Sequence, residues 1–474
     1  MIQRNIQTVV REIKEVLTPT PSELREALRL YEELKKTLEN ILSKSIPYDF
    51  KIELEGSVAK GTSLRGEMDL DVFVLIRYED LNKEWIIEKF VKPVSRELSR
   101  LGRGYRVELR YASHPYVKVY AGNIEADIVP AYWAESIDDI KTPVDRTPFH
   151  TEFVKRNLTD EQRDEVRLLK KFFKGIGVYG AEIKVEGFSG YLTELLIIKY
   201  GSFEGFLKSA VTWREPQIIS LNKLNSYEAS VLRRTFRGAP LIFPDPVDSR
   251  RNVAAAVSRR SMALAMLAAH EFLREPSPKF FFPARKVLSV EELQSRLKST
   301  ERRIILILYD VAKGTSPDII WGELKSVGRR VANILKVNDF NVLDLRFWSD
   351  EKSHAAIYVE LHGGNLSKLK SVKGPTKIGS DLLNFIEKHT VKDPIPPWID
   401  WEGIPRALSL RKIRNPEDLL KKNRNLLNAS HLKLTHITTN LVEKDFRALH
   451  HDSDFLAWLS DAIVKSPPWR EELT

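Results

Sequence analysis

The segment DLDVFVLI at residues 69–76 constrains the fold more than any other part of the sequence. Its continuous apolar run from residue 72 predicts a strand buried in a sheet. Because side chains alternate across a strand, Asp69 and Asp71 point to the same face. Two carboxylates this close repel each other unless a cation lies between them. Oxygen ligands without cysteine or a histidine cluster favour Mg²⁺ or Mn²⁺, so the segment predicts a divalent metal site on a sheet.

A third carboxylate is expected from Asp127, in the strand-like segment IEADIVPAY. Three carboxylates on neighbouring strands can hold two metal ions about 3.5–4 Å apart, an arrangement that suits transfer of a nucleotide to a hydroxyl group. Spacing alone does not select these residues, because Glu67 shares a face with Asp69 and Asp71. Glu125 shares a face with Asp127 in the same way. A solvated pair of acids at the start of a strand is the ordinary alternative.

Gly56 and Ser57 follow a predicted strand at residues 50–56 and precede a probable helical turn. A glycine there lets backbone N–H groups approach a phosphate closely, and the serine hydroxyl adds a donor. Lys60 is expected on the same side. A Gly-Ser pair is common by itself, but its combination with the Asp-Leu-Asp strand is more specific. The sequence lacks the glycine patterns of P-loop and dinucleotide-binding proteins and the G-x-S-x-G of hydrolases.

Composition narrows the class of protein. The chain has 474 residues, enough for three or four domains at roughly 100–200 residues each. The net charge of +10 favours a polyanionic partner, although many basic proteins bind no nucleic acid. The absence of cysteine excludes disulfides, thiol catalysis and Cys-ligated zinc. No apolar run approaches the roughly 20 residues needed to span a bilayer, and the N-terminus lacks a signal-peptide core. We expect a soluble, cytoplasmic protein.

Hydrophobic periodicity divides the chain into three parts. Residues 1–145 predict an α/β catalytic unit, with two helices before residue 45, a helix at 79–101, and strands at 50–56, 69–76, 105–111, 116–120 and 124–129. Residues 146–275 predict helices at 161–177, 190–203 and 253–275. From residue 285 a new unit begins, with a strand at 302–310, a helix at 321–337 and strands at 340–348 and 354–361. This order predicts half of a ferredoxin-like fold over about 300–365. The last hundred residues predict helices and basic loops.

Several of these segments are familiar. EGSVAKGTSLRGEMDLDVFVLI resembles the nucleotidyltransferase motif of the polymerase β superfamily. ASHPYVKV, EADIVPAY, VDRTPFH, EVRLLKKFFKGIGVYGAEIKVEGFSGYLTELLIIKYGSF and DPVDSRRNVAA resemble the archaeal, class I CCA-adding enzymes, in order from about residue 50 to 275. The resemblance implies an α+β multidomain protein. It would have a polymerase β-like head at 1–145, a helical neck at 146–275, and a ferredoxin-like body with an α/β tail at 285–474.

The same resemblance implies template-independent addition of C, C and A to the 3′ end of tRNA from CTP and ATP, with release of pyrophosphate and repair of incomplete ends. Two Mg²⁺ ions would be held by Asp69, Asp71 and Asp127. The triphosphate would lie near Gly56, Ser57 and Lys60. The family often has arginine at the position of Lys60, and the lysine here would lack the bidentate contact that an arginine makes. The first carboxylate, Asp69 in this chain, can be glutamate in relatives. The implied partners are the acceptor and T arm of tRNA, and a second copy in a possible homodimer.

Four residues of the neck segment gain roles from this resemblance. His150, Lys170 and Tyr179 correspond to residues that bind the triphosphate and sugar of the nucleotide, and Arg251 to a residue that helps to read the incoming base. Each has an ordinary alternative. Lys170 and Arg251 are also expected as solvated side chains near helix surfaces, Tyr179 as a half-buried aromatic after a helix end, and His150 as a residue packed at a helix start.

RNA is expected to contact the basic segments 279–286, 328–336 and 411–425, since phosphate contacts dominate such binding. Two other functions stay open at this level. A poly(A) or oligoadenylate-type polymerase would differ in the sequence of its product. A non-catalytic RNA-binding protein would be expected to have lost a metal carboxylate or the Gly-Ser pair, whereas this chain retains both.

Overall fold

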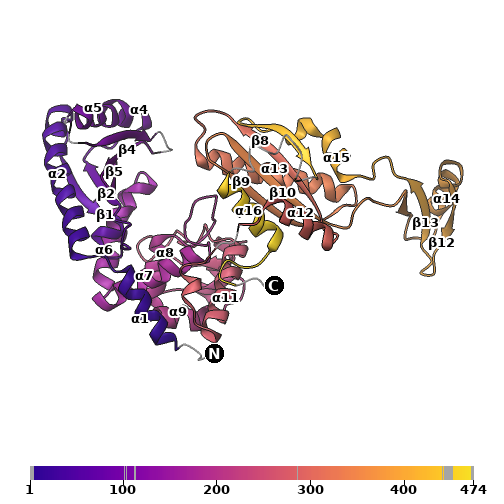
Figure 1. Cartoon of the computed structure of the whole chain (residues 1–474), viewed down its shortest axis with the longest axis horizontal. Coiled ribbons are helices and arrows are strands. Elements are labelled where there is room, and N and C mark those ends of the chain that lie inside the picture. The colour runs from indigo at the N-terminus through magenta and orange to yellow at the C-terminus, as the bar shows by residue number, and fades with distance from the viewer. Residues whose placement is uncertain are drawn as a thin grey trace. The chain divides into compact units, whose positions relative to one another are not determined.

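The computed structural model describes residues 5–100, 102, 104–110, 114–284, 287–439, 441 and 452–470 (Figure 1). The chain forms two compact units, the first comprising Met1–Ala284 with Pro467–Thr474 and the second comprising Arg285–Ser466. Residues 1–145 and 146–275, which differ in sequence pattern, therefore belong to one unit. Among the described helices, none combines the length and apolar character needed to cross a bilayer.

A five-stranded sheet organises the N-terminal half of the first unit. Its order is β1-β2-β5-β4-β3, and β2 and β5 run parallel while the other neighbours are antiparallel. The strands are β1 (Phe50–Glu55), β2 (Leu70–Ile76), β3 (Arg106–Arg110), β4 (Tyr116–Ala121) and β5 (Ile124–Tyr132). All five predicted strands are confirmed. The expected strand at 69–76 begins at Leu70, and residue 111 lies outside the described residues.

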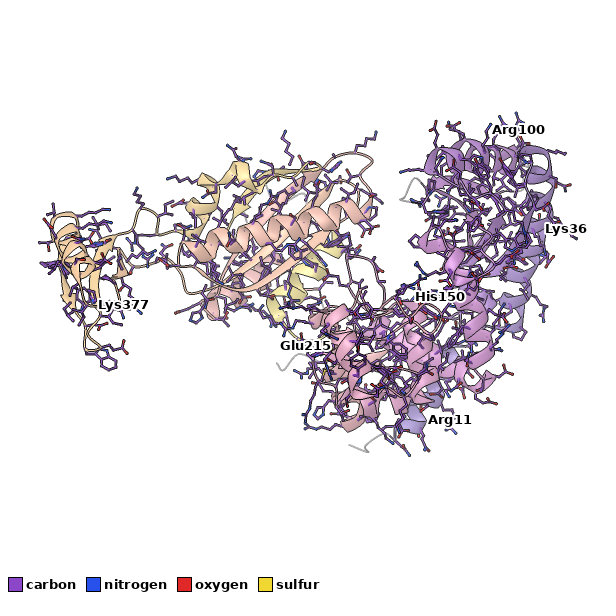
Figure 2. The ribbon with its side chains drawn as sticks, turned by 180° about the vertical axis from the view of Figure 1, so that it is seen from behind. Arg11, Lys36, Arg100, His150, Glu215 and Lys377 are labelled. Carbon is purple, nitrogen blue, oxygen red and sulfur yellow. The ribbon has the colours of Figure 1, made fainter. Side chains whose placement is uncertain are left out.

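Helices cover one face of this sheet. α2 (Pro21–Ser45) begins at a capping box between Thr20 and Glu23. A second helical stretch runs through α4 (Lys83–Trp85), a π turn η1 (Ile86–Val91) and α5 (Lys92–Arg100). It begins later than residue 79 because the Asn82 side chain caps it. Lys36 and Arg100 carry their charges outward from α2 and α5 (Figure 2).

The C-terminal half of the first unit is built mainly from helices, the first of which contacts β1 of the sheet. These are α6 (Thr147–Asn157), α7 (Asp160–Gly175), α8 (Gly190–Tyr200), α9 (Phe203–Ala210), α10 (Ser226–Thr235) and α11 (Arg259–Arg274), with a short sheet of β6 (Gln217–Ile218) and β7 (Leu241–Ile242). Phe172 lies at the centre of their core, surrounded by Phe203, Phe272, Phe280 and Phe281.

Two segments distant in sequence join this helical core. α1 (Ile6–Leu17) buries Val9, Ile13 and Leu17 in it, and Trp469 from the last described residues stacks on Phe280. The predicted start of another helix is also wrong. The helix expected over 253–275 begins only at Arg259, because Ser258 caps it and Asn252 holds the preceding turn through bonds to Phe243 and Ala254.

The second unit is built on a four-stranded antiparallel sheet of order β14-β8-β10-β9. Its elements are α12 (Val290–Ser299), β8 (Arg303–Val311), α13 (Pro317–Val337), β9 (Asn341–Ser349), β10 (His354–His362), α15 (Pro416–Lys422), β14 (Leu432–Thr438) and α16 (Ser453–Val464). The predicted β-α-β-β half is confirmed. α15 and β14 complete it to a β-α-β-β-α-β arrangement, which the sequence pattern did not predict.

An insertion separates α15 and β14 from the first half of this fold in the sequence. Between β10 and α15 lies a smaller sheet of order β11-β13-β12, built from β11 (Leu369–Lys373), β12 (Ile395–Ile399) and β13 (Pro405–Leu410) with α14 (Ser380–Lys392). Helices and basic loops were expected over the last hundred residues, and the strands β12, β13 and β14 in that stretch contradict this. β12 contains two adjacent prolines, which pattern rules exclude from strands, but it lies at a sheet edge where proline is tolerated.

Candidate active site

One pocket of the first unit, about 320 Å³ in volume, lies where the start of β2 faces α7 and α8. It gathers eight of the ten residues singled out in the sequence: Gly56, Ser57, Lys60, Asp69, Asp71, Asp127, Lys170 and Tyr179. It also contains Lys118, Glu125, Gly190 and Glu194, which the sequence did not identify as ligands. His150 and Arg251 do not line this pocket.

The three aspartates come from neighbouring positions on two parallel strands. Asp71 of β2 lies in register with Asp127 of β5, and Asp69 directly precedes β2. Burial, and next the negative charge of Asp127, raise the pKa of Asp71 to about 6. Burial also raises the pKa values of Asp69 and Asp127. Negative charge is thus concentrated where water is scarce, as expected for carboxylates that bind a cation.

The two rival carboxylates are each engaged by a lysine. Glu67 pairs with Lys174, and Glu125 accepts a hydrogen bond from Lys118 at 2.7 Å. Asp127 Oδ1, in contrast, is buried without a hydrogen-bond donor of suitable geometry, although the Lys118 ammonium lies 3.3 Å from it. These contacts favour Asp69, Asp71 and Asp127 over Glu67 and Glu125 as cation ligands, a choice that strand parity left open.

The donor set fits a hard divalent cation. Within the described part of the chain, no three acidic or histidine side chains converge closely enough to hold a metal ion by themselves. Mg²⁺ commonly binds to one or two carboxylates and takes its remaining ligands from water and substrate phosphates. Asp69, Asp71 and Asp127 line one pocket together with Ser57 and Lys60, and so meet that description. The residues therefore suit a metal that arrives with a nucleotide.

Gly56 allows this packing. Its φ of +68° lies in the left-handed region that favours glycine, and a Cβ atom added there would lie 1.7 Å from Asp71 Oδ2. The backbone between β1 and the short helical turn α3 (Gly56–Ala59) thus touches the carboxylate directly. Ser57 follows at the pocket wall, so the Gly-Ser pair lies beside the aspartates, as the sequence predicted.

A buried glutamate joins the two predicted phosphate-side lysines. Glu194 of α8 accepts hydrogen bonds from Lys60 Nζ at 2.6 Å and Thr62 Oγ1 at 2.7 Å, and Lys170 Nζ lies 3.9 Å away. Burial alone would raise the pKa of Glu194, but Lys60 and Lys170 hold it below its usual value. Burial lowers the pKa of Lys170 to about 8. The three groups carry one net positive charge beside Ser57.

Glu194 was missed by sequence reasoning, although a signal existed. It is a lone acid inside the apolar helical run YLTELLII, and a carboxylate in such a run is rarely buried unless it is paired. Arg167 was also missed. It donates to the carbonyl oxygens of Gly61 at 2.6 Å and Ser63 at 2.8 Å, and so holds the segment after the Gly-Ser pair against α7.

His150 and Arg251 meet at a different carboxylate, Asp245. His150 Nε2 lies 2.9 Å from Asp245 Oδ2, and Arg251 Nη1 donates to the same oxygen at 3.2 Å. The His150 ring, labelled in Figure 2, stacks on Tyr191 with centroids 3.9 Å apart, and Tyr191 donates to Asp245 Oδ1. Burial opposes ionisation of Asp245, but His150 and its other donors hold its pKa below the usual range.

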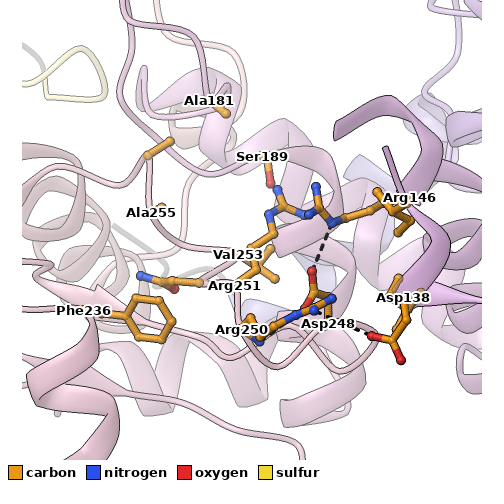
Figure 3. A pocket seen from close by; sticks show the side chains of 14 residues that line it. Asp138, Arg146, Ala181, Ser189, Phe236, Asp248, Arg250, Arg251, Val253 and Ala255 are labelled. Atoms are coloured by element: carbon orange, nitrogen blue, oxygen red, sulfur yellow. Dashed lines mark hydrogen bonds and ion pairs between the residues drawn. The ribbon is translucent and has the colours of Figure 1, made fainter. Parts of the chain in front are cut away.

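Arg251 lines a second pocket, of about 600 Å³, that is rich in arginine (Figure 3). Arg146 and Arg250 lie on it as well, and both donate to the buried carboxylate of Asp248, at 3.2 and 2.8 Å. This pocket includes Ser189, whereas the aspartate pocket includes the next residue, Gly190. The two pockets are therefore adjacent along one segment of chain.

The segments predicted to contact RNA are partly used by the fold. In 279–286, Phe280 and Phe281 are buried in the helical core, and residues 285–286 lie outside the described residues. In 411–425, Arg411 pairs with Asp339 at 2.5 Å, and Arg424 donates to the carbonyl oxygens of Leu434 and Thr435. Within 328–336, Arg330 donates to the Asn428 carbonyl oxygen. Structural bonds thus account for part of the positive charge.

Replacing Glu194 by glutamine is expected to destabilise the first unit by about 3 kcal/mol, because two buried ammonium groups lose their counter-charge. Thermal and urea unfolding would measure the loss. Glu204→Gln on α9 is the matched control, since it breaks only an exposed pair with Lys208 and should cost less than about 0.5 kcal/mol. Equal stability of the two variants would contradict the buried network.

Comparison with known proteins assigns the chain to a family. Residues 34–157 match the nucleotidyltransferase domain, residues 164–282 match the second domain of tRNA nucleotidyltransferase, and residues 300–449 match the C-terminal domain of the CCA-adding enzyme. These three matches follow the same order as the head, neck and C-terminal segments of the sequence.

Solved structures with a similar fold include the RNA terminal uridylyl transferase Cid1, with a TM-score of 0.44, 14% identity, and 58% of this chain and 96% of that chain covered. CdnC of E. coli MS115-1 aligns with a TM-score of 0.44, 18% identity, and 59% and 95% covered.

Relatives named CCA-adding enzyme cover most of the chain. That of Saccharolobus shibatae is 39% identical over 415 residues, which are 88% of this chain and 92% of the relative. That of Sulfurisphaera tokodaii is 35% identical over 439 residues, 92% of this chain and 95% of the relative. With this degree of identity over nearly the whole length, the chain belongs to the archaeal CCA-adding enzyme family.

Proposed function

We propose that this protein adds C, C and A to the 3′ end of tRNA, using CTP and ATP and releasing pyrophosphate, and that it restores incomplete 3′ ends. The observation that carries the proposal is the membership of nearly the whole chain in the CCA-adding family, together with a pocket that holds the carboxylates and the Gly-Ser pair. A protein that only binds RNA has no need of three carboxylates gathered in one pocket beside a Gly-Ser pair.

Asp69, Asp71 and Asp127 would hold two Mg²⁺ ions. When bound, these ions lower the pKa of the acceptor hydroxyl and neutralise charge on the triphosphate and the leaving pyrophosphate. Asp127, which lies opposite Asp71 in the strand register, would orient the RNA 3′-OH. Gly56 keeps the backbone close to Asp71 and leaves room for the phosphates.

The triphosphate would be bound by Ser57 and by the positive charge of Lys60 and Lys170, which Glu194 holds in place. Lys60 offers a point charge where many relatives have an arginine fork, so its contribution is electrostatic rather than bidentate. Tyr179 lines the same pocket and would contact the sugar.

His150 and Arg251 would act at the far end of the nucleotide. Asp245 orients both, so the half-exposed Arg251 guanidinium presents its donors in a defined direction suited to the edge of a base. Residues 1–145 and 146–275 would serve as catalytic head and nucleotide-binding neck. Residues 285–474 would grip the acceptor and T arm of tRNA through surface lysines and arginines, and a homodimer would present two such surfaces.

The direct test is incubation with tRNA that lacks its 3′ CCA, together with CTP, ATP and Mg²⁺, followed by sequencing of the products. We expect C-C-A to be added once, only C residues with CTP alone, and no product when Mg²⁺ is chelated. Asp71→Asn should lower the rate by at least about a thousandfold. Homopolymer growth would favour a poly(A)-type polymerase. Tight tRNA binding without transfer would favour a non-catalytic protein.

Gly56→Ala should reduce the rate of nucleotide addition by at least about a hundredfold, because the added methyl group displaces the Asp71 carboxylate. Gly66→Ala is the matched control. Its φ of +75° carries a similar backbone penalty, but no atom lies within 4 Å of the added Cβ. Steady-state kinetics would compare the two. Similar activity in both variants would show that the close approach to Asp71 has no catalytic importance.

Asp71→Asn should also stabilise the protein when divalent metals are chelated. The folded-state pKa of Asp71 is raised to about 6 from 3.8, so its ionised form destabilises the fold above pH 6. This penalty is relieved as the pH falls through 6 towards 4. Discounted for partial exposure, the variant should gain about 1 kcal/mol at pH 7.5 and less at pH 5, measured by thermal unfolding. Exposed Asp80→Asn should show no such trend.

A further inference from the structure

Lys118 is the one lysine of the aspartate pocket to which the proposed mechanism assigns no part. It lies on β4 directly opposite Asp127 of β5 in the strand register. Its ammonium nitrogen is 2.7 Å from Glu125 Oε2 and 3.3 Å from Asp127 Oδ1, and the side chain is only 17% exposed. It therefore contacts both the carboxylate expected to orient the acceptor hydroxyl and the glutamate that strand parity made its rival.

An ordinary cross-strand ion pair does not explain this arrangement well. A surface lysine opposite an aspartate is usually solvated and contributes little. Here the ammonium is largely enclosed and is shared between two acids on the same face of β5. Lys60 and Lys170 both face Glu194, so among the lysines that line the pocket Lys118 alone contacts the aspartate cluster.

We propose that Lys118 is a positioning residue that sets the affinity of the Asp69, Asp71 and Asp127 cluster for divalent cations. Lys118 is held by Glu125 and orients Asp127. Its ammonium charge repels a divalent cation and so weakens the binding of that cation at Asp127. This proposal rests on the proposed function, which assigns the metal ions to these aspartates.

The physical basis is charge competition. A monovalent cation a few ångströms from a divalent one repels it, and this repulsion weakens metal binding more strongly in a partly desolvated pocket than in water. Glu125 limits the effect because it takes the shorter contact with Lys118 and leaves Asp127 Oδ1 without a hydrogen-bond donor of suitable geometry. The consequence is a metal site that binds well only when nucleotide phosphates supply further ligands.

The test measures Mn²⁺ binding directly, by electron paramagnetic resonance of free Mn²⁺, with full-length protein and no RNA or nucleotide. Lys118→Met should bind Mn²⁺ about tenfold more tightly, since a positive charge beside Asp127 is removed. Lys118→Arg should retain nearly the original affinity. Lys51→Met is the charge-matched control. Lys51 pairs with Glu53 on β1 of the same sheet, outside the aspartate pocket, and its loss should leave Mn²⁺ affinity unchanged.

Thermal unfolding supplies the second readout. Without metal, Lys118→Met should melt at a lower temperature than the original protein because the carboxylates repel one another without a counter-charge. With saturating Mn²⁺, its melting temperature should rise more than that of the original protein. A purely structural role would lower the melting temperature equally with and without Mn²⁺ and leave the affinity unchanged, and that result would overturn the proposal.

Glu125→Gln tests the tether. It should shift Lys118 towards Asp127 and weaken Mn²⁺ binding, and most of this effect should disappear in the Lys118→Met background. Equal weakening in both backgrounds would show that Glu125 acts independently of Lys118.

Because these measurements need no RNA, they separate this proposal from the proposed function. If Asp71→Asn did not change Mn²⁺ binding, the metal assignment itself would fail. Failure of CCA addition with intact Mn²⁺ binding would contradict only the function.

Discussion

Repulsion among carboxylates on one face of a parallel strand pair is the constraint around which the rest of this site is arranged. Asp71 and Asp127 are in register, and the elevated pKa of Asp71 reports both burial and the nearby charge of Asp127. Lysine side chains pair with the two neighbouring glutamates. Lys174 neutralises Glu67, and Lys118 is taken up largely by Glu125. The result is a local excess of negative charge confined to the aspartates, which is the condition for binding a divalent cation.

The same principle links the sheet to the helices. Glu194 of α8 is buried only because Lys60 and Thr62, which follow the Gly-Ser pair, and Lys170 of α7 surround it. Arg167 holds the same stretch through two carbonyl oxygens. A buried charge without its partner is unfavourable by several kcal/mol. Separating the segment that follows the Gly-Ser pair from the helices would therefore be unfavourable. Head and neck segments therefore behave as one unit, and the pocket they share has a defined shape.

Much of the architecture could be predicted because its signals are local. Apolar runs and alternation indicated all five strands of the first sheet, and helical periodicity indicated the helix that is α2. Prediction failed where long-range contacts decide. β14 completes the second sheet only after an insertion of about fifty residues, and β12 is a strand despite its prolines because it lies at an edge. Residues 253–257 look helical, yet the bonds of Asn252 hold them in a turn.

The sequence by itself determined the chemistry of this protein: a Gly-Ser turn, an Asp-Leu-Asp strand and a third aspartate, in an order that resembles one enzyme family. Residue types and spacing are sufficient for that, since they depend only on chain geometry. The family resemblance already implies Asp127 rather than Glu125 as a metal ligand. The tertiary structure adds the position of the Lys118 ammonium, 2.7 Å from Glu125 Oε2 and 3.3 Å from Asp127 Oδ1. It also revealed Glu194 and Asp245, whose partners are distant in sequence. Which carboxylate a lysine engages depends on its neighbours in space, and residue spacing alone does not contain that information.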